Sequence, residues 1–172
     1  RLGLSGVPVA AETIALHTIF ELVRATGARV HLCRLSSAAG VELVRRAKAE
    51  GLPVTADVSI NSLHLTDVDI GYFNPEMRLS PPLRQGRDRD ALRAALADGT
   101  LDALVSDHMP VSSDEKNLPF AEATPGATAP MLPDPLAAMP MNASMTPSTV
   151  PRRPSSGLTD PIVASQEMNR AM

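Results

Sequence analysis

The chain has 172 residues, which suits one domain at roughly 100–200 residues each. Its formal net charge is −3 and it has no run of Lys or Arg, so we expect neither a nucleic-acid groove nor an anionic membrane surface as partner. No apolar stretch approaches the roughly 20 residues of a transmembrane helix. The single cysteine, Cys33, cannot form an internal disulfide. These features predict a cytoplasmic protein.

Proline divides the chain into two compositions. Nine of the 16 prolines fall at or after Pro125, and from residue 129 onward no segment keeps a helical or strand period. Such a segment buries too little apolar surface to offset its ordering entropy. We therefore expect a folded part over residues 1–128 and a disordered Pro-rich tail over residues 129–172. A linker, a docking segment and an out-of-frame extension all remain open for this tail.

The first part of the chain alternates between helical and strand patterns. Apolar residues at helical spacing predict a helix over residues 10–27, and a short apolar run predicts a strand over residues 28–35. The hydroxyls of Ser36 and Ser37 suit the cap of a second helix over residues 38–50. Residues 52–59 form the next expected strand, which residues 63–67 either extend or leave as a loop.

The later part repeats the same alternation less regularly. A proline-containing loop comes first, in which residues 77–79 could form a very short strand. A helix over residues 88–98 and a strand over residues 101–106 follow. Repeated strand and helix units with short connections predict an α/β fold with a parallel sheet, either open or closed into a barrel.

The chemistry of such folds lies at the carboxyl ends of the strands. At the end of the last expected strand, Asp107 and His108 could bind a metal or act as a base, or could simply cap and solvate a loop. In the first strand His31 and Cys33 alternate with Leu32, so both point to one face and Arg34 to the other.

Zinc needs three or four ligands, and no C-x-x-C or H-x-x-x-H spacing occurs in the chain. We therefore interpret His31 and Cys33 as core-filling residues. His17 and His64 have no second ligand nearby in sequence and are expected to be structural. A G-x-S-x-G elbow, a phosphate loop and a dinucleotide fingerprint are also absent from the sequence.

Several short motifs, taken in order, resemble the dihydroorotases of the amidohydrolase superfamily over residues 1 to about 128. They are G-L-S-G-V-P at 3–8, A-E-T-I-A at 11–15, T-G-A-R-V-H-L-C-R-L-S-S at 26–37, P-P-L-R at 81–84, A-D-G-T-L-D-A-L-V-S-D-H at 97–108 and E-K-N-L-P-F at 115–120. The resemblance implies a metal-dependent (β/α)8 TIM barrel that interconverts carbamoyl-aspartate and dihydroorotate. This chain would hold its C-terminal half, from about strand 5 to strand 8, and the remaining metal motifs would lie outside it.

The departures from the family's metal ligands carry the functional hypothesis. Arg34 stands where active relatives have a metal-binding histidine, and Asn61 and Ser62 replace the histidines of the next motif. A guanidinium stays charged, so it cannot ligate a cation and would repel one. Of the ligands expected in this half, Asp107 alone survives, as a relic position.

Two further positions differ from the family's substrate-binding pattern. Ser80 replaces an asparagine before the P-P-L-R motif, and Val111 replaces the second histidine of the last motif. The resemblance therefore implies no metal, no catalytic residue and no substrate-binding residue among these positions. A metal hydrolase without its ion loses the means to activate water.

This pattern is similar to that of the noncatalytic dihydroorotase-like subunit of some bacterial aspartate carbamoyltransferases. The leading hypothesis is a structural subunit that forms a hetero-oligomer with the catalytic chain of aspartate carbamoyltransferase. One alternative is a fragment of an active, zinc-dependent dihydroorotase that uses His31, His64 and Asp107 with ligands from the missing half. A third is a half-barrel with exposed sheet edges, poor solubility and no function of its own.

Overall fold

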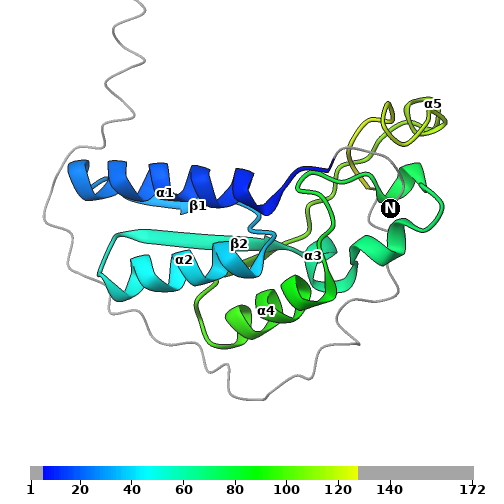
Figure 1. The fold of residues 1–172 in the computed structure, drawn as a ribbon. Coiled ribbons are helices and arrows are strands. Elements are labelled where there is room, and N and C mark those ends of the chain that lie inside the picture. Colours follow the sequence, from blue (N-terminus) through cyan, green and yellow to red (C-terminus); the bar gives the residue numbers. More distant parts are fainter. Residues whose placement is uncertain (1–5, 128–172) are drawn as a thin grey trace, which may run out of the picture. The chain divides into compact units, whose positions relative to one another are not determined.

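The computed structural model describes residues 6–127, in which helices and strands alternate along the chain (Figure 1). The tail predicted from residue 129 lies outside the described residues. Within residues 6–127 no helix is both long and apolar enough to cross a membrane. The elements are α1 (Val9–Thr26), β1 (Val30–Leu32), α2 (Ala38–Ala49), β2 (Val54–Ser59), α3 (Ile60–His64), α4 (Gly86–Ala97), β3 (Ala103–Val105) and α5 (Ser113–Lys116), with 3-10 helices at Asp67–Ile70 and Pro75–Met77.

The three strands of the described part form a parallel sheet in the order β1-β2-β3. Val30 of β1 is opposite Val54, and Asp57 of β2 is opposite Ala103 of β3. The prediction of an α/β fold with a parallel sheet is confirmed. The short strand considered for residues 77–79 was wrong, because Met77 ends the 3-10 helix Pro75–Met77 and residues 78–79 form neither helix nor strand. The Arg78 N–H caps this helix by donating to Pro75 O at 3.1 Å.

Two boundaries differ from the sequence prediction for identifiable reasons. The strand expected over residues 28–35 is shorter, because Arg34 adopts a left-handed backbone conformation, with φ 57°, that no strand can continue. Residues 60–64 form α3 instead of prolonging β2. Ser59 caps this helix, since its Oγ accepts the Asn61 N–H at 3.2 Å.

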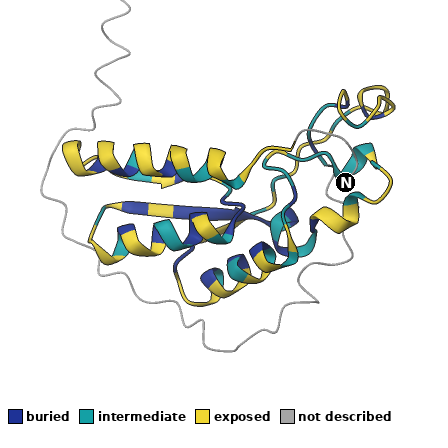
Figure 2. Ribbon diagram, in the orientation of Figure 1, coloured by how far each residue is buried: buried dark blue, intermediate teal, exposed yellow. Residues whose placement is uncertain are grey.

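The core lies between one face of the sheet and the helices α1, α2 and α4. Val54, Ala56 and Val58 of β2 are buried on this face, and burial of each valine side chain contributes about 1.5–3 kcal/mol. On the opposite face His31 and Thr55 are exposed. Figure 2 shows that β2 has both buried and exposed segments. The core is aliphatic apart from Phe20; its helical members include Leu16, Phe20, Val23, Val41, Val44, Ala47, Leu92 and Ala95.

A carboxylate attaches α1 to the turn between β1 and α2. Glu12 Oε2 accepts the N–H of Ser36 at 3.0 Å and its hydroxyl at 2.5 Å. Glu12 Oε1 accepts the N–H of Ser37 at 3.2 Å and its hydroxyl at 2.6 Å. Gly40 makes room for this contact, because a Cβ there would lie 2.1 Å from Glu12 Oε1. One side chain therefore binds two consecutive residues of a distant turn.

The start of α2 is fixed from two other directions. Ser37 Oγ accepts the Gly40 N–H at 3.0 Å, which confirms the predicted capping role of this serine. Asp88 of α4, a buried carboxylate, accepts the Ala38 N–H through Oδ1 at 2.9 Å. The first turn of α2 thus joins α1 and α4 at the carboxyl edge of the sheet.

The hydrogen bonds of Glu12 predict that replacing one of its carboxylate oxygens lowers the stability of the fold strongly. In Glu12→Gln an NH2 group replaces one acceptor oxygen, so at least one serine N–H loses its partner. We expect the free energy of unfolding to fall by about 2 kcal/mol, the size typical of hydrogen bonds to a charged group. Urea unfolding of the chain measures this change.

Glu21→Gln is the matched control on the same helix. Glu21 is 74% exposed and pairs with Arg24 at the surface, where an ion pair contributes little. An equal loss in both variants would contradict the assigned role of Glu12.

Candidate functional site

The carboxyl edge of the sheet is organised by Asp57, whose side chain is 7% exposed. Its Oδ1 accepts the backbone N–H of Arg34 at 2.6 Å, and its Oδ2 accepts from His31 Nε2 at 2.9 Å. Asp57 belongs to β2, whereas both partners belong to β1 or to the turn that follows it. This carboxylate therefore sets the direction in which the chain leaves β1.

An ion pair joins the ends of β1 and β3. Arg34 Nη1 lies 3.1 Å from Asp107 Oδ1 and also donates to Ser80 O at 3.1 Å. Both Arg34 and Asp107 have left-handed backbone conformations, with φ of 57° and 49°. Arg34 therefore leaves the strand alternation from which we expected its direction, and its side chain lies at the edge of the sheet with Asp107.

Three other positions singled out in the sequence, Asn61, Ser80 and Val111, do not join this ion pair through their side chains. Asn61 is buried in the first turn of α3, and Ser80 contributes only its carbonyl oxygen. Val111 is half-buried and packs closely against Gly126. A Cβ added at Gly126 would lie 2.6 Å from Val111 Cγ2. His108 is exposed. Of these candidates the structure brings together Arg34 and Asp107.

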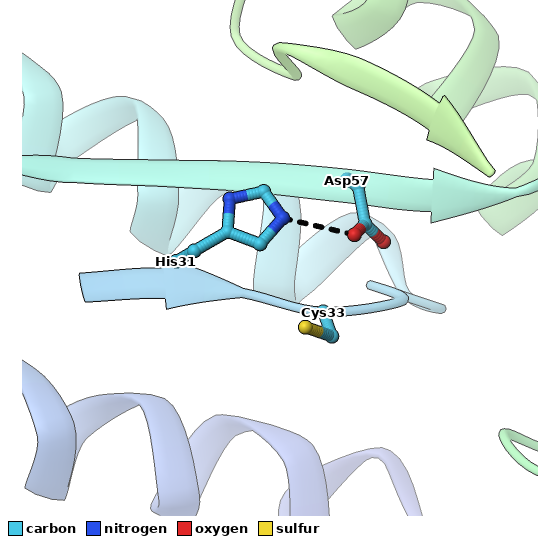
Figure 3. A group of neighbouring side chains, drawn as sticks. All are labelled: His31, Cys33 and Asp57. Carbon is cyan, nitrogen blue, oxygen red and sulfur yellow. Dashed lines mark hydrogen bonds and ion pairs between the residues drawn. The ribbon is translucent and has the colours of Figure 1, made fainter. Parts of the chain in front are cut away.

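A second group of polar side chains lies on the face of the sheet that the described helices leave open, here called the uncovered face. Three atoms that could ligate a metal lie within 4.8 Å of one another here (Figure 3). They belong to the side chains of His31, Cys33 and Asp57. His31 and Cys33 are exposed, so their interpretation as core residues was wrong. Their predicted common face is consistent with this cluster. The strand register places His31 opposite Thr55, and Asp57 follows two residues later on the same face.

Sequence reasoning missed Asp57, because its role depends on pairing with another strand. A signal was present in the alternation of Thr55, Asp57 and Ser59, which predicts one shared face once the two strands are aligned. That alignment became available only with the register. The cluster is therefore a product of tertiary structure.

His64 lies apart from both groups, at the end of α3. Its Nε2 is buried without a hydrogen-bond partner among the described residues. Burial lowers the pKa of His64 below its ordinary value of 6.5, and the positive charges of Arg93 and Arg89 lower it further. His31 thus has Cys33 and Asp57 as neighbouring ligand candidates, and the proposed set of His31, His64 and Asp107 does not form a cluster among residues 6–127.

The chain is 46% identical over 136 residues to a dihydroorotase-like protein of Pseudomonas aeruginosa and 44% identical over 128 residues to a dihydroorotase of Anaeromyxobacter dehalogenans. The alignments cover 79% and 73% of this chain but 32% and 30% of those relatives. The chain is a homologue of the dihydroorotases. It spans about a third of the length of these relatives. No protein-family model matches the chain.

The fold of this dihydroorotase homologue is similar to that of solved amidohydrolase-type structures. A D-hydantoinase (dihydropyrimidinase) from Thermus sp. superposes with a TM-score of 0.66 at 28% sequence identity. The match covers 71% of the homologue and 28% of the hydantoinase. The described part therefore corresponds to a partial domain of that fold.

The ion pair of the dihydroorotase homologue predicts a measurable coupling. In a double-mutant cycle with Arg34→Met and Asp107→Asn, we expect a coupling of roughly 0.5–1 kcal/mol in the free energy of unfolding, since solvent screens a partly exposed pair. The Arg34 side chain is 37% exposed and that of Asp107 is 12% exposed. Urea unfolding of the four proteins measures the coupling. Strictly additive effects would show that the pair contributes nothing.

The partly buried ring of His64 predicts a pH dependence of stability. An unfolded histidine takes up a proton near pH 6.5, whereas the folded His64 resists protonation, so the unfolded chain binds more protons as the pH falls through this value. Stability should therefore fall on acidification. His64→Leu should lose less unfolding free energy than the wild type between about pH 8 and about pH 5. Parallel pH profiles of the two proteins would contradict this assignment.

Proposed function

We propose that the chain is part of an inactive dihydroorotase homologue that serves as a structural subunit. The observation that carries the proposal is the ion pair between Arg34 and Asp107. In the family pattern, Arg34 occupies the position of a metal-binding histidine and Asp107 that of a metal-binding aspartate. The guanidinium donates directly to the surviving carboxylate and supplies the positive charge beside it.

The zinc that the resemblance implies does not fit the residues at these positions. Arg34 Nη1 lies 3.1 Å from Asp107 Oδ1, so a permanent cation occupies one coordinating direction of the carboxylate. The guanidinium would repel a second cation at this place and already neutralises the carboxylate that would attract it. Asn61, at the position of the next histidine, offers an amide in place of an imidazole.

The other departures support the same proposal. Ser80 and Val111 replace family residues for substrate binding, and Ser80 lies exposed with its carbonyl bonded to Arg34. The Pseudomonas aeruginosa relative is called a dihydroorotase-like protein, which is compatible with a protein outside the active enzymes. Substitution at several functional positions within an intact α/β core favours a role that needs the fold without the chemistry.

The role that fits this pattern is assembly. We place the protein in the cytoplasm, in a hetero-oligomer with the catalytic chain of aspartate carbamoyltransferase, where it would hold catalytic units together in pyrimidine biosynthesis. This proposal follows from the similarity to the noncatalytic subunit. A partner bound through a protein surface requires no metal and no substrate site.

An active dihydroorotase with an unusual ligand set is the second candidate. The relative from Anaeromyxobacter dehalogenans, 44% identical, is a dihydroorotase by name, and this favours hydrolysis of a cyclic amide. Such an enzyme would take ligands from outside the present chain. Turnover separates the two candidates, because the structural subunit has none.

The test uses the complete protein that contains this chain, purified with and without added zinc. We expect no interconversion of carbamoyl-aspartate and dihydroorotate above the uncatalysed rate. The Anaeromyxobacter dehalogenans dihydroorotase, assayed in parallel, shows that the assay detects activity. Turnover that depends on Asp107 would overturn the proposal and favour the second candidate.

The assembly role has its own measurement. Co-expression with the aspartate carbamoyltransferase catalytic chain should yield a complex that contains both proteins, scored by native mass. Separate elution of the two proteins at equal concentrations would refute the structural role.

A further inference from the structure

We propose that His31, Cys33 and Asp57 form a zinc site on the uncovered face of the sheet. It is distinct from the family's ligand positions at Arg34, Asn61 and Asp107. The proposal depends on geometry within the chain and does not rest on the proposed function.

The three side chains supply the donor types that zinc selects in proteins. Imidazole nitrogen, thiolate sulfur and carboxylate oxygen bind zinc at about 2.0–2.3 Å. Tetrahedral geometry then places neighbouring donors roughly 3.4–3.6 Å apart. His31 Nε2 and Asp57 Oδ2 are 2.9 Å apart, and all three candidate donors lie within 4.8 Å of one another. The exposed Cys33 side chain can rotate to bring its sulfur closer to the other two donors.

Two hydrogen bonds already orient the donors. His31 Nδ1 lies 2.8 Å from Thr55 Oγ1, so Nδ1–H can donate to this hydroxyl while Nε2 turns to the metal. Asp57 Oδ1 accepts the Arg34 N–H at 2.6 Å, which holds the carboxylate while Oδ2 remains for the ion. Partners of this kind fix the orientation of the ligands in metal sites.

The charges and the exposure of the site favour a cation. Asp57 and a Cys33 thiolate carry two negative charges, whereas the neighbouring Arg34 guanidinium is paired with Asp107. On binding, Cys33 releases its proton to solvent, and the ring proton of His31 moves from Nε2 to Nδ1, where Thr55 Oγ1 accepts it. The zinc ion then takes the place that this proton held between His31 Nε2 and Asp57 Oδ2. Among the described residues the His31 side chain is 44% exposed, which leaves room for a fourth ligand. Three protein ligands and one water form a common zinc arrangement.

The experiment titrates the 172-residue chain with cobalt(II) as a spectroscopic substitute for zinc. Tetrahedral coordination by a thiolate gives a sulfur-to-cobalt charge-transfer band in the near ultraviolet and intense visible bands. Because Cys33 is the single cysteine of the chain, the charge-transfer band reports this residue alone. We expect both features to appear at one cobalt per chain and to disappear when zinc is added.

Variants separate the site from adventitious binding. Cys33→Ser should remove the charge-transfer band. Thr55→Val should weaken cobalt binding by about tenfold, the size of effect typical when a residue that hydrogen-bonds to a metal ligand is replaced. His17→Ala is the matched control, because His17 is an exposed histidine on α1. It should leave the titration unchanged, and circular dichroism verifies that each variant folds.

Two results would overturn the site: no thiolate-cobalt band in the folded wild type, or a band that His31→Ala leaves unchanged. Neither result bears on the structural subunit. Conversely, dihydroorotate turnover by the complete protein would refute the structural role while the cobalt spectrum still decides the zinc site.

Discussion

The arrangement at the carboxyl edge of the sheet depends on one buried carboxylate, Asp57. A carboxylate with 7% exposure is costly to bury unless both oxygens have partners, and here each has one. The bond to the Arg34 N–H holds a left-handed residue that would otherwise relax. The bond to His31 aligns the ring on the open face. Asp57 therefore connects the ion pair and the metal-ligand cluster.

The ion pair at this edge shows how a metal position can be replaced without leaving a bare charge. Asp107 is largely buried, so removal of a metal alone would leave a carboxylate without compensation. A guanidinium is a cation that the chain itself carries, and it also satisfies the Ser80 carbonyl. On the proposed function, the substitution exchanges a catalytic cation for a structural one.

Features that depend on interactions close in sequence could be predicted from the sequence, whereas features that depend on contacts between distant residues could not. The helices α1, α2 and α4 were predicted from the spacing of apolar residues within each segment. Their observed ends lie within a residue or two of the predicted ones. The five-residue helix α3 carries no such period. Its existence depends on the Ser59 cap at the end of β2.

The candidate site was harder to predict from the sequence, because it depends on contacts between distant residues. The left-handed turn at Arg34 depends on a hydrogen bond to Asp57, 23 residues later. The cluster around His31 needs the register of two strands, which local pattern does not specify. Resemblance to the dihydroorotases supplied the positions that chemistry would need, and geometry then showed which side chains meet.

The close approach of α1 and α2 at Gly40 makes the sizes of two distant residues interdependent. A side chain at position 40 would occupy the place of the Glu12 carboxylate, so it can be accommodated only if residue 12 becomes shorter. A shorter residue 12 would in turn release the hydroxyls of Ser36 and Ser37. The residues at positions 12, 36, 37 and 40 are therefore constrained to change together, and a substitution at any one of them is limited by the other three.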